Sequence, residues 1–262
     1  YHYLPIYYEL IKRGVNTKII SEPCSINISG GYFDYNTAIK ILEENNIDYS
    51  TECNPDACVS ITTQRSNILK KYKNTKIHLS YGVSLIKSIF SLSNESCFGF
   101  DARILHGLFS QKNLIPYMDR DVLYPIGYPK HDSYFKNKPE KNVLLHQLDI
   151  ATNKPILVYL PTYDEDTSIQ LFGNEIGVLR DKFYILTKPH HCTARLPEKS
   201  YDLERLYAIS DKVLDGNASF TDICSCADFY ITDAKSGASL ESLYINSKPA
   251  VFLTPRNGPA LK

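Results

Sequence analysis

The residues best suited to chemistry in this chain follow short apolar runs that are typical of buried strands. The run 229–232 is followed by the polar turn 233–237 (DAKSG), and residues 238–245 then carry apolar side chains at helical spacing. A serine hydroxyl and the backbone N–H groups at a helix N-terminus favour an anion, typically a phosphate. The sequence therefore predicts a phosphate-binding turn at Ser236 and Gly237. The ordinary alternative is a helix that Ser236 simply caps.

Four further turns with polar or glycine residues follow predicted strands. Ligands of parallel α/β sheets bind outside the carboxyl ends of the strands, so we expect the binding site at these turns. They are 81–82 (YG), 127–132 (GYPKHD), 162–163 (TY) and 188–191 (KPHH).

The elements that must position these turns alternate between strand and helix in two consecutive series. Such alternation predicts an α/β protein whose parallel sheets carry helices on both faces. We expect two Rossmann-like domains, 1–133 and 134–262, facing a cleft, with the polar stretch 134–142 as a linker. The predicted strands are 17–20, 57–61, 76–80, 97–100, 122–126, 156–160, 183–186, 212–214, 229–232 and 250–253. The predicted helices are 3–12, 35–44, 66–71, 85–90, 102–111, 219–225 and 238–245.

Composition narrows the function further. The chain has 262 residues and a formal net charge of zero, which gives no support for a general nucleic-acid binder. We find no apolar run approaching the ~20 residues needed to span a bilayer. The seven cysteines are odd in number and match no zinc spacing, so we expect reduced thiols in a cytoplasmic protein. Neither a cofactor nor a metal is expected, since the adjacent residues 190–192 cannot easily converge on one ion.

The ends of the chain suggest a piece of a longer protein. Residue 1 is Tyr rather than Met, and the first predicted element is a helix where an α/β domain normally begins with a strand. Lys262 also follows closely on the last predicted strand.

Five segments in order resemble motifs of the CDP-glycerol glycerophosphotransferases, the teichoic-acid and capsule primases and polymerases. The segments are 127–132 (GYPKHD, resembling G-Y-P-R-N-D), 159–163 (YLPTY, resembling A-P-T-W/Y), 187–191 (TKPHH, resembling R-x-H-P), 222–236 (resembling D-I-N-x-L…S-D-x-L-I-T-D-Y-S-S) and 247–252 (resembling K-P-I-I-F). The resemblance covers nearly the whole chain. It implies the GT-B fold, with an acceptor domain at 1–133 and a truncated nucleotide-donor domain at 134–262.

Two departures from the family pattern stand out. Residues 79–87 align with the family's W-H-G-T-P-L-K, but Tyr81 stands where the family has its catalytic His. Gly237 and Glu241 are similar instead to the S-G-x-x-x-E helix start of nucleotide-sugar glycosyltransferases and epimerases.

The resemblance assigns a role to each candidate site residue. The catalytic pair is His190, at the family's histidine position, and Tyr81. Donor-binding residues are Lys188, His191, Thr162, Asp233, Lys235, Ser236, Gly237, Ser239 and Glu241. Acceptor-side residues are Gly82, Lys87, Lys130 and Asp132.

Each residue also has a structural alternative. His190 could lie on the surface or pack, Lys235 and Glu241 could be solvated, and Thr162 and Asp132 could serve their turns. For His190 itself two roles are open, a general base or a cationic phosphate ligand, because histidine titrates near neutral pH. The ligand role is favoured because Tyr81 has replaced the family's other His.

The resemblance implies a transferase that moves glycerol phosphate, or a related alditol phosphate or sugar, from a CDP-linked donor to a cell-surface polymer or lipid-linked acceptor. It also implies a peripheral contact with the inner face of the membrane. The zero net charge adds the expectation of no nucleic-acid partner. Two alternatives are a UDP-sugar glycosyltransferase or 2-epimerase-like enzyme, and a degenerate member that binds nucleotide or polymer without turnover.

Overall fold

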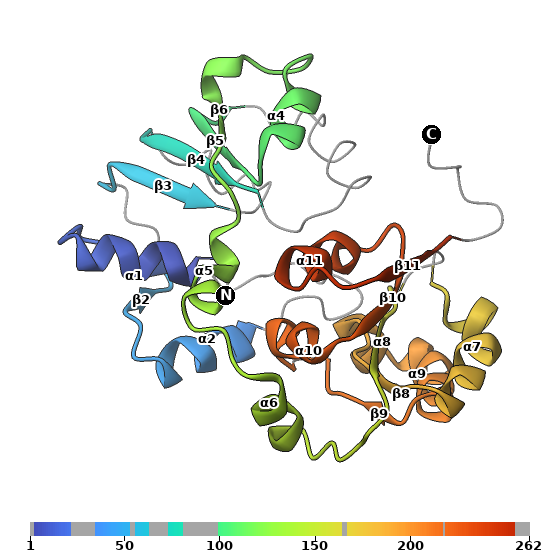
Figure 1. Ribbon diagram of the computed structural model, residues 1–262. Helices are drawn as coiled ribbons and strands as arrows, with labels where there is room; N and C mark the ends of the chain where they lie inside the picture. The colour runs from blue at the N-terminus through green and yellow to red at the C-terminus, as the bar shows by residue number, and fades with distance from the viewer. Residues whose placement is uncertain are drawn as a thin grey trace. The chain divides into compact units, whose positions relative to one another are not determined.

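The computed structural model describes residues 3–21, 35–52, 56–62, 73–80, 99–163, 167–216 and 218–254. These residues form two compact units, unit 1 from residues up to Ser133 and unit 2 from Tyr134 onward (Figure 1). Within these ranges, no helix has the length and apolar character needed to cross a membrane.

Unit 1 contains a parallel sheet with the strand order β3-β4-β5-β6, and a separate parallel pair, β1-β2. The strands are β1 (Ile19–Ile20), β2 (Tyr49–Ser50), β3 (Val59–Thr62), β4 (Thr75–Leu79), β5 (Ala102–Leu105) and β6 (Leu123–Pro125). The helices are α1 (Leu4–Lys12), α2 (Tyr35–Glu44), α4 (Leu108–Leu114) and the 3-10 turns η3 (Arg120–Val122) and η4 (Pro129–His131). Its buried core joins Leu105, Leu114 and Leu123.

The helix predicted at 102–111 is wrong in its first half. Residues 102–105 form β5, which lies between β4 and β6 with Ile104 opposite Tyr124. Sequence reasoning missed this strand because Arg103, fully buried, is an unusual residue for a strand interior. Its Nη1 donates to Met118 Sδ at 3.2 Å. The strand predicted at 97–100 lies partly outside the described residues, and its last two residues are not in a strand.

Unit 2 is built on a five-stranded parallel sheet in the order β11-β10-β7-β8-β9. Its strands are β7 (Ile156–Leu160), β8 (Tyr184–Thr187), β9 (Lys212–Val213), β10 (Phe229–Asp233) and β11 (Ala250–Leu253). In chain order the first strand therefore lies in the middle, as in doubly wound nucleotide-binding folds. The parallel sheets of both units confirm the predicted α/β class.

The helices of unit 2 include two that the sequence did not predict, α7 (Ile169–Val178) and α9 (Ser200–Ile209). The supposed linker 134–142 is also wrong: it holds the end of α5 (Asp132–Lys136) and the start of α6 (Lys141–Gln147). Tyr134 is buried, and its hydroxyl lies 2.8 Å from Ser225 Oγ. The remaining elements are α8 (His191–Arg195), α10 (Phe220–Cys226), α11 (Gly237–Ile245), η5 (Leu179–Asp181) and η6 (Pro197–Lys199).

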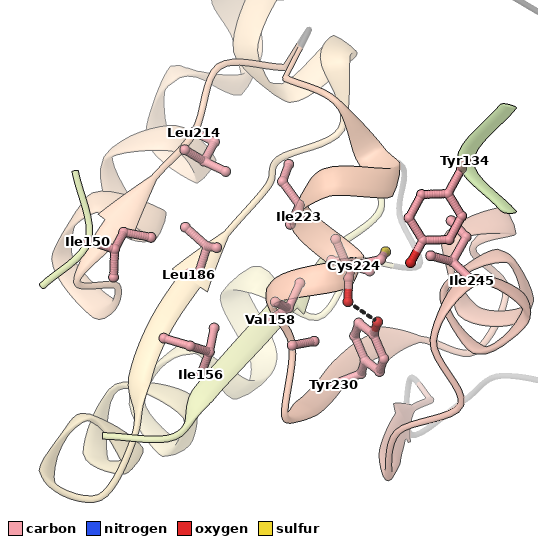
Figure 2. Packing of buried hydrophobic residues seen from close by; sticks show 12 residues of the cluster. Tyr134, Ile150, Ile156, Val158, Leu186, Leu214, Ile223, Cys224, Tyr230 and Ile245 are labelled. Atoms are coloured by element: carbon pink, nitrogen blue, oxygen red, sulfur yellow. Dashed lines mark hydrogen bonds between the residues drawn. The ribbon is translucent and has the colours of Figure 1, made fainter. Parts of the chain in front are cut away.

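The sheet of unit 2 buries both of its faces, because successive side chains of a strand point to opposite sides. On one face α10 and α11 cover the cluster that Figure 2 shows, where the Tyr230 hydroxyl donates to the Cys224 carbonyl at 2.8 Å. On the other face α7 and α9 cover a second cluster. The strand β7 divides its residues between the two, with Ile156, Val158 and Leu160 in the first and Leu157 and Tyr159 in the second.

Two aspartates fasten the amino ends of the central strands. Asp228 Oδ2 accepts from the backbone N–H of Ile156 at 2.9 Å and from Lys141 Nζ at 2.6 Å. Asp211 Oδ2 accepts from the N–H of Ile185 at 2.8 Å. The carboxyl ends of the same strands carry the residues singled out from the sequence.

Candidate donor site at the carboxyl edge of unit 2

The strand order of unit 2 reverses direction between β7 and β10. Chain connections leave β7 toward β8 on one side, whereas β10 and β11 were added on the other. In open parallel sheets such a switch point separates the loops and leaves a crevice for a ligand. Thr162 and Tyr163 follow β7 at this point, and Asp233 ends β10.

Asp233 holds the loop that follows β7. Its carboxylate is almost fully buried, and Oδ2 accepts from the N–H of Thr162 at 2.7 Å and from that of Ser168 at 3.3 Å. Thr162 precedes the loop and Ser168 follows it, so one carboxylate fastens both ends. This arrangement gives Asp233 a structural task, and the donor contact expected from the sequence stays a prediction.

Side-chain hydroxyls complete the base of the same loop. Thr167 Oγ1 donates to the Thr162 carbonyl at 2.9 Å, and the Tyr159 hydroxyl lies 2.7 Å from Ser168 Oγ. Burial, together with the nearby Asp233 charge, raises the pKa of Tyr159 far above its ordinary value. Tyr159 therefore stays protonated and acts as a structural hydrogen-bonding group.

The turn after β10 caps α11. Ser236 is buried, and its Oγ accepts from the N–H of Ala238 at 3.2 Å. Ser239 Oγ donates back to the Ser236 carbonyl at 2.7 Å. The structural alternative for Ser236 is therefore observed. The start of this helix, at Gly237, lies at the carboxyl edge of the sheet, where the helix dipole favours an anion.

Two charged residues lie near this helix start. Glu241 is 7% exposed, so its interpretation as a solvated helix residue is wrong. Lys235 is half-buried beside Ser236, which places a cationic side chain next to the helix N-terminus.

His190 follows β8 and caps the short helix α8. Its Nδ1 accepts from the N–H of Cys192 at 3.2 Å. The Tyr163 ring stacks on the imidazole, with centroids 4.4 Å apart and planes 22° apart. The ring of His191 lies on it as well, at 4.1 Å and 32°.

These contacts favour the neutral form of His190. A proton on Nδ1 would face the Cys192 N–H and leave that buried donor without its acceptor, at a cost of about 1–3 kcal/mol. Stacking a cation on Tyr163 gains only about 0.5–1 kcal/mol at an accessible site. The neutral ring therefore carries its proton on Nε2.

The segment after β9 packs against the loop after β8 through Gly216, which contacts Lys188 and His191. Lys188 Nζ donates to the Gly216 carbonyl at 2.7 Å. A Cβ added to Gly216 would lie 3.0 Å from the Cα of His191. Sequence reasoning did not select Gly216, although a glycine after a predicted strand was the signal that could have found it.

The side chains of His190, His191 and Cys192 offer ligand atoms that all lie within 4.8 Å of one another. The sequence argument that adjacent residues cannot converge thus underestimated their proximity. Ring orientation still opposes a shared ion, because imidazole lone pairs lie in the ring plane and the two planes are only 32° apart at 4.1 Å. We assign no metal here.

The acceptor-side residues belong to unit 1. Lys130 Nζ lies 5.7 Å from the centre of the Tyr128 ring, and Asp132 is exposed at the start of α5. Gly127 has a φ of +113°, which explains the glycine at this turn. Tyr81, Gly82 and Lys87 lie outside the described residues.

The turn 127–132 also contains an aromatic cluster that sequence reasoning missed. The ring of Tyr128 makes edge contacts with His106 and with the buried His131, at 4.7 and 5.0 Å. These packed rings explain why the turn is built from Tyr and His, so its histidine needs no chemical role.

A groove of about 620 Å³ lies at the opposite, amino edge of the unit 2 sheet. Two of its lysines are engaged, Lys141 with Asp228 and Lys154 with the Arg180 carbonyl at 2.7 Å. The groove is therefore separate from the residues that the sequence selected.

Residues 113–249 match the family model of CDP-Glycerol:Poly(glycerophosphate) glycerophosphotransferase, which includes Thr162, His190, Asp233 and Ser236. The chain belongs to this family. The match confirms the resemblance read from the sequence motifs. No curated protein matches the chain significantly.

Solved structures with a similar fold include the wall teichoic acid polymerase TagF, in a variant soaked with CDPG. It shares 19% identity at a TM-score of 0.54, covering 75% of this chain and 53% of TagF. The UDP-GlcNAc 2-epimerases of Methanocaldococcus jannaschii and Neisseria meningitidis share 15% and 12% identity at TM-scores of 0.60 and 0.59. The aligned regions cover 96% and 97% of this chain and 80% of each epimerase. The chain thus has the GT-B type of fold and spans about half the length of the TagF chain.

Proposed function

We propose that this chain is a transferase of alditol phosphate, which moves glycerol phosphate or a close relative from a CDP-linked donor to a hydroxyl of a polymer or lipid-linked acceptor. The observation that carries the proposal is the cluster at the switch point of unit 2, which lies within the family match. There a helix start, a lysine and an oriented imidazole follow neighbouring strands.

The proposed reaction assigns a task to each group. The acceptor oxygen attacks the β-phosphorus of the donor, the bond to the bridging oxygen breaks, and CMP leaves with the bonding electrons. The acceptor proton passes to a base or to solvent. The start of α11 with Lys235 would bind the negative charge of the pyrophosphate, and His190 would donate Nε2–H to one of its oxygens.

The acceptor domain, the cytoplasmic location and a contact with the inner membrane face belong to the same proposal. Their support is the family membership, since TagF is named for polymerising wall teichoic acid. The domain roles proposed are acceptor binding for 1–133 and donor binding for 134–262.

A second candidate is an enzyme that acts on UDP-linked sugars. It is favoured by the buried Glu241 on the first turns of α11, since a buried carboxylate can accept hydrogen bonds from sugar hydroxyls. A binding protein without turnover is the third candidate, suggested by Tyr81 in place of the family's His.

One experiment separates the three. Binding of CDP-glycerol, CDP-ribitol and UDP-GlcNAc is measured by calorimetry, and turnover by ³¹P NMR release of CMP or UDP with a glycerol phosphate oligomer as acceptor. We expect CDP-linked donors to bind and release CMP. Preference for UDP-GlcNAc, or CDP-donor binding without any CMP release, would contradict the transferase proposal. The same two measurements on His190→Ala test the role of this imidazole. His146→Ala, which removes an exposed histidine on α6, is the matched control.

A further inference from the structure

We propose that Tyr163 is a positioning residue that, together with the backbone N–H of Cys192, holds His190 as a neutral donor of its Nε2–H. The proposal rests on the proposed function for the identity of the acceptor, an anionic oxygen of the donor pyrophosphate. It assigns a task to a residue that the sequence analysis left without one.

Two aromatic rings pack against the His190 ring. The ring centroid of Tyr163 lies 4.4 Å from that of His190, with 22° between the ring planes. The ring centroid of His191 lies 4.1 Å from it, with 32° between the planes. Rotation of the His190 ring about its bond to Cβ would disturb its contacts with Tyr163 and His191.

One edge of the ring is also fixed. Nδ1 accepts from the Cys192 N–H at 3.2 Å, which places the proton of the neutral ring on Nε2. In the proposal, the opposite edge, with Nε2, donates to the ligand. A general base would need its lone pair on Nε2 and its proton on Nδ1, where the Cys192 N–H already points.

Tyr163 can hold its ring in place because the residue before it, Thr162, is fixed by two hydrogen bonds. The preceding Thr162 donates its N–H to Asp233, and the Thr162 carbonyl accepts from Thr167 Oγ1. These bonds join the ends of β7 and β10 to the ring that packs on the histidine after β8. Three neighbouring strands thus share in orienting one imidazole.

The test compares Tyr163→Leu with Tyr163→Phe, since phenylalanine keeps the stacked ring and leucine does not. The matched control is Tyr207→Leu, which removes an exposed ring on α9. Long-range ¹H–¹⁵N NMR of ¹⁵N-histidine protein, with the His190 signals assigned by loss in His190→Gln, reports which ring nitrogen carries the proton. Steady-state turnover of CDP-glycerol gives kcat and KM.

We expect wild type, Tyr163→Phe and Tyr207→Leu to show His190 protonated on Nε2 alone at pH 7.5. Tyr163→Leu should show exchange between tautomers and a kcat at least about tenfold lower, because a misplaced donor loses part of its transition-state contact. Tyr163→Phe should restore kcat to within about threefold of wild type.

Two results would overturn the proposal: a wild-type His190 protonated on Nδ1, or a Tyr163→Leu protein with unchanged tautomer and kcat. If wild type turns over no CDP-linked donor, the proposed function fails instead. The NMR comparison needs no turnover and still decides whether Tyr163 positions His190.

Discussion

The carboxylate of Asp233 accepts a 2.7 Å hydrogen bond from the backbone N–H of Thr162, and this bond joins the carboxyl ends of two adjacent strands at the switch point of the sheet. The same Oδ2 accepts from Ser168, so the loop between β7 and α7 is fastened at both ends by one buried atom. Asp233, selected from the sequence as a donor-binding residue, thus also fixes the shape of the site.

Replacing Asp233 by Ala should destabilise the protein by about 2–4 kcal/mol, because two buried N–H groups lose their acceptor. Asp233→Asn, which keeps one acceptor oxygen, should lose less. Urea unfolding measures both, with the exposed Asp181→Ala as control. An unchanged urea midpoint for Asp233→Ala would show that these bonds contribute nothing.

His190→Ala should weaken binding of a CDP-linked donor about ten- to a hundredfold, which corresponds to a hydrogen bond to a charged group of about 1.5–3 kcal/mol. Because Nδ1 accepts from Cys192, we expect the same loss at pH 6 and at pH 8. The alternative from the sequence, a cationic ligand, expects a larger loss at pH 6. Calorimetry at both pH values decides between them.

Gly216→Ala should disturb the site, since its Cβ would lie 3.0 Å from the His191 Cα, a backbone atom that cannot rotate away. We expect a loss of about 1–3 kcal/mol in stability, as for other overpacked positions, and weaker donor binding. Gly177→Ala is the control, because its Cβ would meet Ile209 at an ordinary 3.4 Å within α7. That change should be neutral or stabilising by up to about 1 kcal/mol. Equal effects of the two changes would contradict the close packing at Gly216.

The pair of Lys141 and Asp228 should make stability depend on pH in the acid range. Burial raises the pKa of Asp228, but hydrogen bonds from Lys141 and from the Ile156 N–H, with the nearby lysine charges, outweigh it and lower that pKa. Because the pKa of Asp228 is lower in the folded protein than in the unfolded chain, its ionised carboxylate stabilises the fold at pH values above the unfolded pKa of ~3.9. That stabilisation is lost as the pH falls through the folded pKa.

Lys141→Met should therefore reduce stability at pH 6 by less than about 1 kcal/mol, since both side chains are about a third exposed. The difference from wild type should shrink as the pH falls below the unfolded pKa of ~3.9 and vanish once Asp228 is protonated in the folded protein. Urea unfolding as a function of pH measures this difference, and a difference that does not decrease on acidification would assign the effect to packing of the lysine stem.

The strand–turn–helix–strand segment that ends the chain was predictable because its local signals agree. Residues 229–253 combine a β-branched run, a capping serine, helical spacing and a second apolar run, and the structure has β10, α11 and β11 at these places. The strand Ile156–Leu160 was also predicted with its observed bounds, since a wholly apolar run of five is typical of a doubly covered parallel strand.

The elements that the sequence concealed are those in which packing overrides local pattern. β5 contains a buried arginine, and α7 contains two glycines, Gly173 and Gly177, that oppose a helix locally but allow α9 to pack closely. The site residues of unit 2 could be selected because they follow strands. Their tasks could not, because the contacts of Asp233 and His190 depend on partners contributed by other segments.

The central place of β7 has a consequence for how unit 2 assembles. β7 and β8 pair across a short stretch of chain, with Leu157 opposite Ile185, whereas β10 must return from Phe229 to reach the same Leu157. Closing the longer segment costs more chain entropy, so we expect β7 to β9 to fold as an early half and β10 with β11 to dock later. The Thr162–Asp233 hydrogen bond joins these two halves. A nascent chain would therefore complete its candidate ligand-binding site only after β10 and β11 have docked.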